Sequence, residues 1–338
     1  MERLESTSNS PERPVGLLGL GAYVPERVMP NAEWAEHVDT SDEWIRERTG
    51  IERRRIAAEG ESTADLATEA ASRALADAGL APAEVGEIIL ATDSPEVPSP
   101  DTAAIVQHRL GAGPVPTYDL AGSGCAGFLL GLDLARSRVL AGRRNVLVIG
   151  VEVLSKIMSW RDRSTCVLFG DGAGAAVVSR GPAVAPILGV VAGTDGGRAG
   201  ILGKEVGGTR SPFSREELEA GRHDRLTMDG QEVYRAAVTH MGAAAREVLA
   251  LTGHRLEDVS LFVPHQANLR IIRTVARNLE LPDSRVFVNL QEYGNTGSAS
   301  IPLSLWEARR TGRLAEGDLA LLTAFGAGFH WAAALVRF

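Results

Sequence analysis

The strongest constraint on the fold is that this chain of 338 residues contains one pattern twice. Residues 71–90 (ASRALADAGLAPAEVGEIIL) are similar to residues 245–263 (AREVLALTGHRLEDVSLFV), with Gly79 at the position of Gly253. Each stretch predicts a helix that stops at a glycine, an acidic turn and an apolar strand. Such a repeat predicts two related halves with the same order of elements.

Two further pairs of segments keep the same order and spacing. CAGFLLGLDLARS, from Cys125, is similar to SASIPLSLWEARR, from Ser298, and NVLVIGVE is similar to DLALLTAF. Short continuous apolar strands such as EIILATD and LFVPH are typical of a sheet covered by helices on both faces. The sequence therefore predicts a layered α/β protein. The polar, Gly-rich segment 193–224 is expected to be an excursion outside the core.

Composition and charge exclude several classes of protein. A hydrophobic content of 44% suffices for a large core, whereas the apolar runs are shorter than the roughly 18 residues of a membrane span. The first residues are polar and unlike a signal peptide, so we expect a cytoplasmic protein. A net charge of −8 argues against nucleic acid as a partner, and the two cysteines suggest neither a disulfide framework nor a metal centre.

Cys125 is the candidate nucleophile. It follows the strand-like VPTYDL and the turn AGSG, and it precedes the apolar run AGFLLGLDLARSRVL, which predicts a buried helix. A thiol at a helix N-terminus is expected to have a lowered pKa, which favours the thiolate. The alternative is that Cys125 is a small packed apolar residue, as we expect for Cys166.

Two other polar residues are predicted to lie near Cys125. His265 ends the apolar strand LFVPH, and the carboxyl ends of such strands are where ligands bind; a core histidine is the alternative. Asn295, in the turn EYGNTGSASIPL, could donate from its amide, or could simply form the turn. Because Cys125 and Ser298 are equivalent in the duplication, the Asn295 loop should lie opposite the Cys125 loop.

DLAGSGCAGF, VPHQANLRI, YGNTGSASIP and the terminal FGAGFHWAAALVRF together resemble the 3-oxoacyl-[acyl-carrier-protein] synthase III family, a branch of the thiolase superfamily. TSDEWIRERTGIERRRIA and RDRSTCVLFGDGAG also resemble it. The resemblance implies a thiolase-like α/β fold whose two pseudo-symmetric halves give a five-layered α-β-α-β-α arrangement. We expect a polar extension over residues 1–14, a first half over 15–184 with Cys125, and a second half over 185–338 with His265 and Asn295.

The resemblance also implies a reaction and its catalytic residues. Cys125 would carry an acyl group, and His265 and Asn295 would hydrogen-bond the thioester oxygen of malonyl-carrier protein as it becomes an enolate. Two preorganised donors in a dry site stabilise that charge better than water does. The carbanion left by decarboxylation would then attack acyl-Cys125. The backbone N–H groups of Cys125 and Ala327 would form the oxyanion site of acyl transfer.

Substrate contacts follow from the same resemblance. Trp44 and Arg163 are expected at the nucleotide of coenzyme A, Asn268 along the pantetheine tunnel, and Ser99 and Phe325 at the acyl pocket. Core packing and solvated charge are the alternatives for Trp44 and Arg163. A basic face on the helix after His265 suits an acidic carrier protein, although solvated surface is the usual meaning of such a stripe. Its residues are Arg270, Arg273 and Arg277, with Arg235 nearby.

The expected substrates are thioesters of coenzyme A and phosphopantetheine, with no cofactor, no metal and no membrane partner, and the expected assembly is a homodimer. Ser99 stands where relatives often have a bulky aromatic residue, and His330 and Ala332 also depart from the family pattern, so the primer need not be acetyl. Two alternatives to an initiating ketosynthase are open. One is a specialised ketosynthase that joins two carrier-bound acyl chains, for example in pyrone formation, and the other is a non-condensing acyltransferase. A noncatalytic subunit would be expected to lose Cys125.

Overall fold

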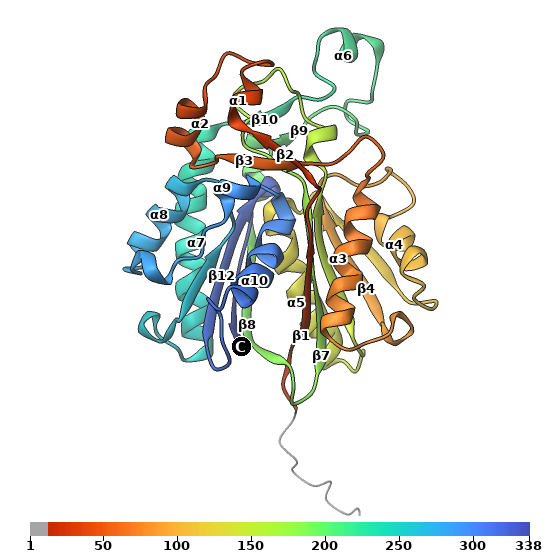
Figure 1. Cartoon of the computed structure of the whole chain (residues 1–338), viewed down its shortest axis with the longest axis vertical. Coiled ribbons are helices and arrows are strands. Elements are labelled where there is room, and N and C mark those ends of the chain that lie inside the picture. The colour runs from red at the N-terminus through yellow and green to blue at the C-terminus, as the bar shows by residue number, and fades with distance from the viewer. Residues whose placement is uncertain (1–12) are drawn as a thin grey trace, which may run out of the picture.

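The computed structural model describes residues 13–338, so most of the expected extension 1–14 lies outside the described residues. Nine strands form one sheet, which is nearly divided at its middle because β1 and β8 pair over only two residues each. From this junction the two halves diverge (Figure 1). In sheet order the strands are β11 (Leu261–Pro264), β12 (Leu319–Gly326), β13 (His330–Arg337), β8 (Ala185–Thr194), β1 (Val15–Tyr23), β7 (Gly172–Arg180), β6 (Val146–Glu152), β4 (Glu87–Thr92) and β5 (Thr117–Ala121).

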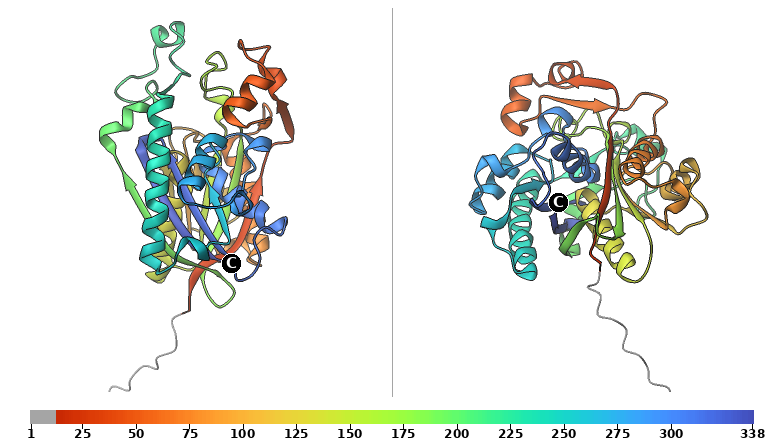
Figure 2. Two further views of the ribbon diagram at one scale, coloured as in Figure 1. Left: turned by 90° about the vertical axis from the view of Figure 1, so that its left-hand side faces the viewer. Right: turned by 60° about the horizontal axis from the view of Figure 1, so that its bottom comes forward.

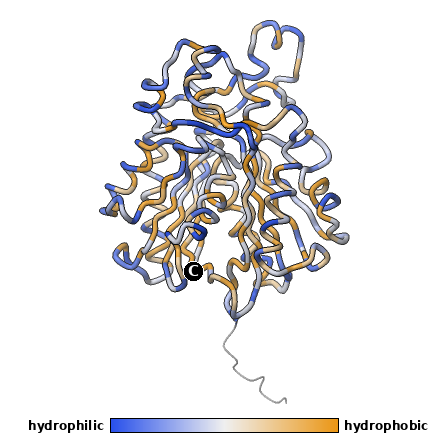
Figure 3. Tube along the Cα trace, in the orientation of Figure 1, coloured by the Kyte–Doolittle hydropathy of each residue, from blue (hydrophilic) through white to orange (hydrophobic). Residues whose placement is uncertain are grey.

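Helices fill the space between the half-sheets and cover their outer faces (Figures 1 and 2). The central pair is α5 (Gly127–Leu140) and α10 (Ser300–Arg310). On one outer side lie α7 (Gly230–Thr252) and α8 (Leu269–Asn278), and on the other α3 (Thr63–Asp77) and α4 (Thr102–Leu110). Three buried clusters separate the layers, and Figure 3 shows the hydrophobic stretches concentrated along strands and inner helices. The predicted five-layered α/β fold is confirmed.

The duplication has a clear structural counterpart. α3 and α7 both end next to a glycine with positive φ, Gly79 at 66° and Gly253 at 69°. A short 3-10 turn and a buried strand follow each, and both strands, β4 and β11, pair in parallel with a neighbour. Positive φ favours glycine because a Cβ is strained there. The expected boundary between residues 184 and 185 falls between β7 and β8.

Smaller elements complete the end of the molecule where the parallel strands finish. They are β2 (Arg27–Pro30), β3 (Arg53–Ile56), β9 (Leu202–Lys204), β10 (Leu226–Met228), α1 (Asn31–Trp34), α2 (Asp42–Thr49), α6 (Arg215–Glu219) and α9 (Leu290–Tyr293). The predicted excursion contains β9 and α6, and α6 projects from the body (Figure 1). Within residues 13–338 no helix is long and apolar enough to cross a membrane.

Candidate active site

A cavity of about 1290 Å³ opens beyond the carboxyl ends of β4, β5 and β11, and Cys125, His265 and Asn295 all line it. The three residues come from different segments: a turn after β5, the end of β11 and the loop before α10. Ligands commonly bind at the carboxyl ends of parallel strands, because the following loops converge there. The structure thus brings together the three residues that the sequence predicted to meet.

Cys125 lies in a one-turn 3-10 helix, Gly124–Ala126, which leads directly into α5. Close backbone packing holds this turn. A Cβ on Gly326, the last residue of β12, would lie 2.2 Å from the Cys125 nitrogen, and one on Gly124 would lie 2.4 Å from the Ala327 nitrogen. The backbone of the β12 end, including Ala327, therefore packs against the nucleophile turn. The oxyanion site that the resemblance implies, with the backbone N–H groups of Cys125 and Ala327, would lie between these two turns.

The expected lowering of the Cys125 pKa is wrong in this structure. Burial raises the pKa of the thiol, and the nearby carboxyl groups of Asp93 and Glu152 raise it further. The Asn295 hydrogen bond acts in the opposite direction but does not outweigh them. The effect of the helix N-terminus on this pKa is outweighed by burial and by two acidic neighbours that lie far from Cys125 in the sequence. Cys125 is therefore a protonated thiol that must lose its proton when it reacts.

The imidazole of His265 is fixed by one contact and leaves one nitrogen facing the cavity. Its Nδ1 lies 2.6 Å from Ser300 Oγ, and its buried Nε2 has no hydrogen-bond partner in the described chain. Ser300 is itself buried, and its hydroxyl has no other partner among the contacts of residues 13–338. A buried hydroxyl hydrogen needs an acceptor, so Ser300 donates to Nδ1 and the ring proton sits on Nε2.

Burial lowers the pKa of His265 to about 3, so the ring is neutral at physiological pH. The backbone N–H of His265 donates to Thr323 O at 2.8 Å, which fixes the end of β11 against β12. Neutral imidazole with its proton on Nε2 is a hydrogen-bond donor toward the cavity. The core-histidine alternative does not explain an unpartnered nitrogen at this position.

Asn295 is oriented by its own loop. Its Oδ1 accepts from the Gly297 N–H at 2.9 Å, its backbone N–H donates to Leu168 O, and its carbonyl accepts from Gly170 N–H. Because Oδ1 is occupied, the amide Nδ2 is the group left to face Cys125. Asn295 and His265 are thus two neutral donors beside one thiol, an arrangement able to stabilise negative charge on a substrate oxygen.

The residues expected to contact coenzyme A lie at or near the cavity, with one unexpected contact. Trp44 and Asn268 line it, while the guanidinium of Arg163 lies over the Trp44 ring, 4.8 Å from its centroid, and donates to Asp39 O. Arg163 therefore occupies one ring face on which an adenine could stack. Asn268 also caps α8, because its Oδ1 accepts from Arg270 N.

The predicted basic face is exposed beside the cavity mouth. Arg270, Arg273 and Arg277 project from α8, and among residues 13–338 none of them forms an ion pair with a carboxylate. Arg270 and Arg235 also line the cavity, although Arg235 pairs with Glu232 at 2.7 Å. The face is thus an available cationic surface next to the cavity that Cys125 lines.

The residues expected at the acyl pocket differ in position. Phe325 lines the cavity and stacks on His240, whereas Ser99 is exposed on the loop before α4 and does not reach this chain's own cavity.

His330 forms a hydrogen bond of 2.7 Å with Thr194, and Ala332 is buried in β13. Cys166 is fully buried and does not line the cavity, as expected. Within the described chain no cluster of metal-ligating side chains occurs.

Sequence reasoning missed three polar residues. Asp93 follows β4 and lines the cavity, Glu152 ends β6 fully buried, and Ser300 holds His265. The signal for Asp93 was present, since it ends the apolar strand EIILATD as His265 ends LFVPH. Part of the segment 193–224 was also misjudged, because Leu202, Gly203 and Lys204 line the cavity and are not merely an excursion.

Comparison with known proteins agrees with this geometry. Residues 118–196 match the family described as 3-Oxoacyl-[acyl-carrier-protein (ACP)] synthase III, and residues 249–338 match its C-terminal family. The chain is 48% identical over 323 residues to beta-ketoacyl-[acyl-carrier-protein] synthase III of Caldanaerobacter subterraneus, covering 95% of this chain and 97% of the relative.

Two solved structures extend the comparison. The beta-ketoacyl-[acyl carrier protein] synthase III of Thermus thermophilus has a TM-score of 0.88 at 46% identity, covering 96% of this chain and 99% of the other. The priming beta-ketosynthase of the R1128 polyketide biosynthetic pathway has a TM-score of 0.87 at 38% identity, covering 98% and 99%. The similarity extends over nearly the full length of each chain.

Proposed function

Because this chain belongs to the 3-oxoacyl-[acyl-carrier-protein] synthase III family, we propose that Cys125 receives the acyl primer and that His265 and Asn295 stabilise the enolate of malonyl-carrier protein. The chain is a carbon–carbon bond-forming acyltransferase that condenses an acyl primer with malonyl-carrier protein. The product is a 3-oxoacyl-carrier protein, which serves fatty acid or polyketide synthesis.

The main support for assigning catalytic roles to Cys125, His265 and Asn295 is the pair of neutral hydrogen-bond donors beside the thiol. Nε2 of His265 is buried and has no partner among residues 13–338, and Asn295, whose Oδ1 accepts from the Gly297 N–H, hydrogen-bonds Cys125 through its side chain. Decarboxylation places negative charge on the thioester oxygen, which two such donors stabilise. A non-condensing acyltransferase develops no enolate and would not need the Asn295 donor.

The proposed chemistry needs no cofactor or metal, since loss of carbon dioxide itself creates the carbanion. Coenzyme A and phosphopantetheine thioesters are substrates. Backbone N–H groups of Cys125 and Ala327 would hold the oxyanion of acyl transfer, which is supported by the close packing of their two turns. The exposed arginines of α8 would bind the acidic carrier protein. Coenzyme A would bind at Trp44, Arg163 and Asn268.

A homodimer in the cytoplasm is the proposed state of the protein. β5 is the last strand of the nine-stranded sheet, no strand of residues 13–338 pairs with its outer edge, and Tyr118 is 42% exposed on it. An unpaired edge with an exposed aromatic residue suits pairing with a second copy. Pairing there would place the exposed loop with Ser99 where a partner's acyl pocket could receive it.

The similarity to a polyketide priming ketosynthase keeps a second pathway open. Ser99, if it enters the partner's pocket, would leave space for a longer or branched acyl chain than an aromatic residue allows. Priming of polyketide synthesis, or the joining of two carrier-bound chains, would use the same three catalytic residues. The choice among these depends on which thioester loads Cys125.

Intact mass after incubation with a panel of acyl-coenzyme A and acyl-carrier thioesters measures loading, and adding malonyl-carrier protein then measures condensation. Short acyl-coenzyme A should add one acyl group to the wild type and none to Cys125→Ala. Cys166→Ala, which removes the other cysteine, should load normally. Loading only by long carrier-bound chains would favour the specialised ketosynthase. The absence of any adduct on Cys125 would refute the proposed function.

A further inference from the structure

Asp93 presents a carboxylate at the cavity next to the nucleophile turn. It directly follows β4, as Cys125 follows the neighbouring strand β5, and both residues line the cavity. Its Oδ1 accepts from the N–H of Gly124, the residue before Cys125, at 3.2 Å. Its Oδ2 accepts no hydrogen bond from any residue of the described chain, so this oxygen is free to take a proton.

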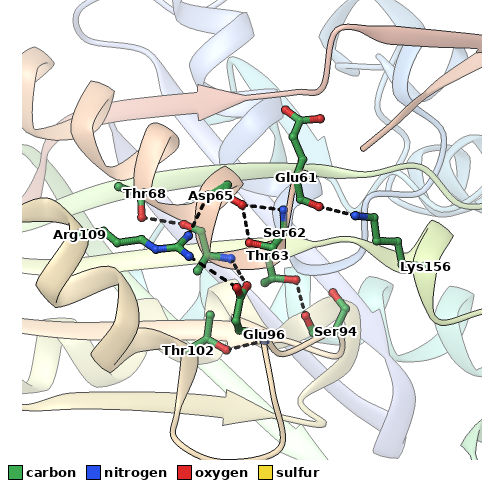
Figure 4. A network of polar contacts seen from close by, with 11 residues as sticks. Glu61, Ser62, Thr63, Asp65, Thr68, Ser94, Glu96, Thr102, Arg109 and Lys156 are labelled. Atoms are coloured by element: carbon green, nitrogen blue, oxygen red, sulfur yellow. Dashed lines mark hydrogen bonds and ion pairs between the residues drawn. The ribbon is translucent and has the colours of Figure 1, made fainter. Parts of the chain in front are cut away.

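The loop that carries Asp93 is held firmly against α3 (Figure 4). Thr63 Oγ1 donates to the Ser94 carbonyl at 2.5 Å, and the Ala64 N–H donates to the Glu96 carboxylate at 2.8 Å. Arg109 lies 3.6 Å from the same carboxylate. A side chain on a loop anchored at Ser94 and Glu96 is held in position for chemistry and does not swing freely into solvent.

Asp93 shares its surroundings with the buried carboxyl group of Glu152. The Glu152 carboxylate accepts from the Asp93 N–H at 3.1 Å, from Ser94 Oγ at 2.8 Å and from Ser298 Oγ at 2.9 Å. Within residues 13–338 neither carboxyl group forms an ion pair. Two neighbouring carboxyl groups with little access to water oppose each other's ionisation, so the pair keeps one proton up to a higher pH than a single exposed carboxyl group would. Burial accordingly raises the pKa of each.

His265 is a poor acceptor for the thiol proton. Its Nδ1 lone pair is occupied by the Ser300 hydroxyl and its Nε2 already carries a proton. Its pKa of about 3 also gives it little affinity for a second proton. The thiol proton of Cys125 therefore has to go elsewhere when the thioester is attacked.

We propose that Asp93 is the proton acceptor for Cys125 during acylation, with the transfer direct or through one water. This inference rests on the proposed loading of Cys125. As Sγ forms its bond to the acyl carbon, the thiol proton passes to Asp93. The bond from that carbon to the coenzyme A sulfur then breaks, and Asp93 returns the proton to the leaving thiolate, so the step is proton-neutral. His265 and Asn295 are left to act only in decarboxylation.

The test separates acylation from decarboxylation in the full-length enzyme. Rapid-quench intact mass follows acylation of Cys125 by acyl-coenzyme A, and carbon dioxide release from malonyl-carrier protein alone follows decarboxylation. Asp93→Asn keeps an acceptor for the Gly124 N–H but cannot take a proton. We expect acylation to slow by about 100-fold while decarboxylation changes less than about threefold. Asp93→Ser should show the same selective loss of acylation as Asp93→Asn, and Asp93→Glu should recover part of the acylation rate.

The pH profile gives a readout that a structural defect would not reproduce. The titratable groups that face Asp93 are Cys125, Glu152 on β6 and His330 on β13, with His265 across the cavity. In wild type the acylation rate should rise as the shared proton is lost, and Asp93→Asn should abolish that rise. Asp119→Asn, the same change on β5, should leave the profile unchanged.

Wild-type acylation kinetics in Asp93→Asn, or a parallel fall in both steps, would overturn the proposal. Failure of wild type to load at all would instead refute the proposed function, so the two failures are distinguishable.

Discussion

At the residue scale, the environment of each proposed catalytic group decides its protonation state. His265 is buried and Cys125 is partly buried at the cavity, and the causes of their states differ: loss of water contact alone keeps the imidazole neutral, whereas loss of water contact together with two carboxyl groups keeps the thiol protonated. A neutral imidazole donates and a protonated thiol must be activated. In the proposed mechanism the site has a donor side, with His265 and Asn295, and an acidic side, with Asp93 as the proton acceptor and Glu152 beside it.

This division predicts that variants of His265 and Asn295 lose mainly decarboxylation, whereas variants of Asp93 lose mainly acylation. His265→Ala and Asn295→Ala should each lower carbon dioxide release from malonyl-carrier protein by about 100-fold or more, because each removes one donor to the enolate oxygen. Acylation of Cys125 by acyl-coenzyme A should stay within about tenfold of wild type in both variants. Single-turnover mass spectrometry measures both steps. A loss of acylation equal to the loss of decarboxylation would contradict the division.

Glu152 also links the site to the stability of the fold. Burial raises its pKa above the ordinary value of 4.5, so the folded chain keeps a proton that the unfolded chain has lost. The stabilisation is fully present below pH 4.5 and is lost as pH rises toward the folded-state pKa. Glu152→Gln has no such proton, so its melting temperature should gain a few degrees relative to wild type between about pH 5 and about pH 8. A constant difference across that range would show that the carboxyl does not titrate with folding.

At the element scale, the fold could be predicted because the duplication repeats whole elements. Gly79 and Gly253 both end helices, and the turns at Cys125 and Ser298 both precede a central helix. Spacing alone could not predict contacts between segments distant in the chain. The Ser300 contact to His265, the Arg163 stacking on Trp44 and the acidic neighbours of Cys125 all depend on three-dimensional packing. The pKa of Cys125 was mispredicted for this reason.

The packing of β12 against the nucleophile turn gives a test at this scale. Gly326→Ala adds a Cβ 2.2 Å from the Cys125 nitrogen, which backbone atoms cannot relieve without moving. We expect a loss of about 1–3 kcal/mol in the free energy of unfolding and a larger relative loss in acylation rate. Gly181→Ala meets nothing within 4 Å and is the matched control. Chemical denaturation and loading kinetics decide the outcome.

The exposed basic face of α8 gives a second test at the element scale. Arg273→Glu should raise the KM for malonyl-carrier protein about tenfold, since it replaces attraction by repulsion toward an acidic partner, and the effect should shrink at high salt. Loading from acyl-coenzyme A should not change. Arg180→Glu, at the far end of β7, reverses an exposed charge away from the cavity and should leave both values unaltered. Equal effects from the two variants would rule out a specific docking face.

At the scale of the whole molecule, two half-sheets meeting at β1 and β8 leave β5 as one outer edge of the sheet. The cavity at the carboxyl ends of the strands is built from both halves, with Cys125 from the first and His265 and Asn295 from the second. The loop with exposed Ser99 lies between β4 and α4, close in sequence to that free edge. In the proposed dimer, a second copy paired along β5 would bring its own loop toward this site.

Disrupting the β5 edge should therefore affect both assembly and primer choice. Tyr118→Lys places a charge on an exposed edge residue that contributes nothing to the cavity of its own chain. We expect native mass spectrometry to show a dimer for wild type and a larger monomer fraction for the variant, since an edge charge opposes strand pairing. If Ser99 completes the partner's acyl pocket, Ser99→Phe should leave the dimer intact and restrict loading to the shortest acyl groups. A wild-type monomer that loads Cys125 at full rate would show that the site is complete in one chain, and an unchanged acyl preference in Ser99→Phe would place that loop outside the pocket.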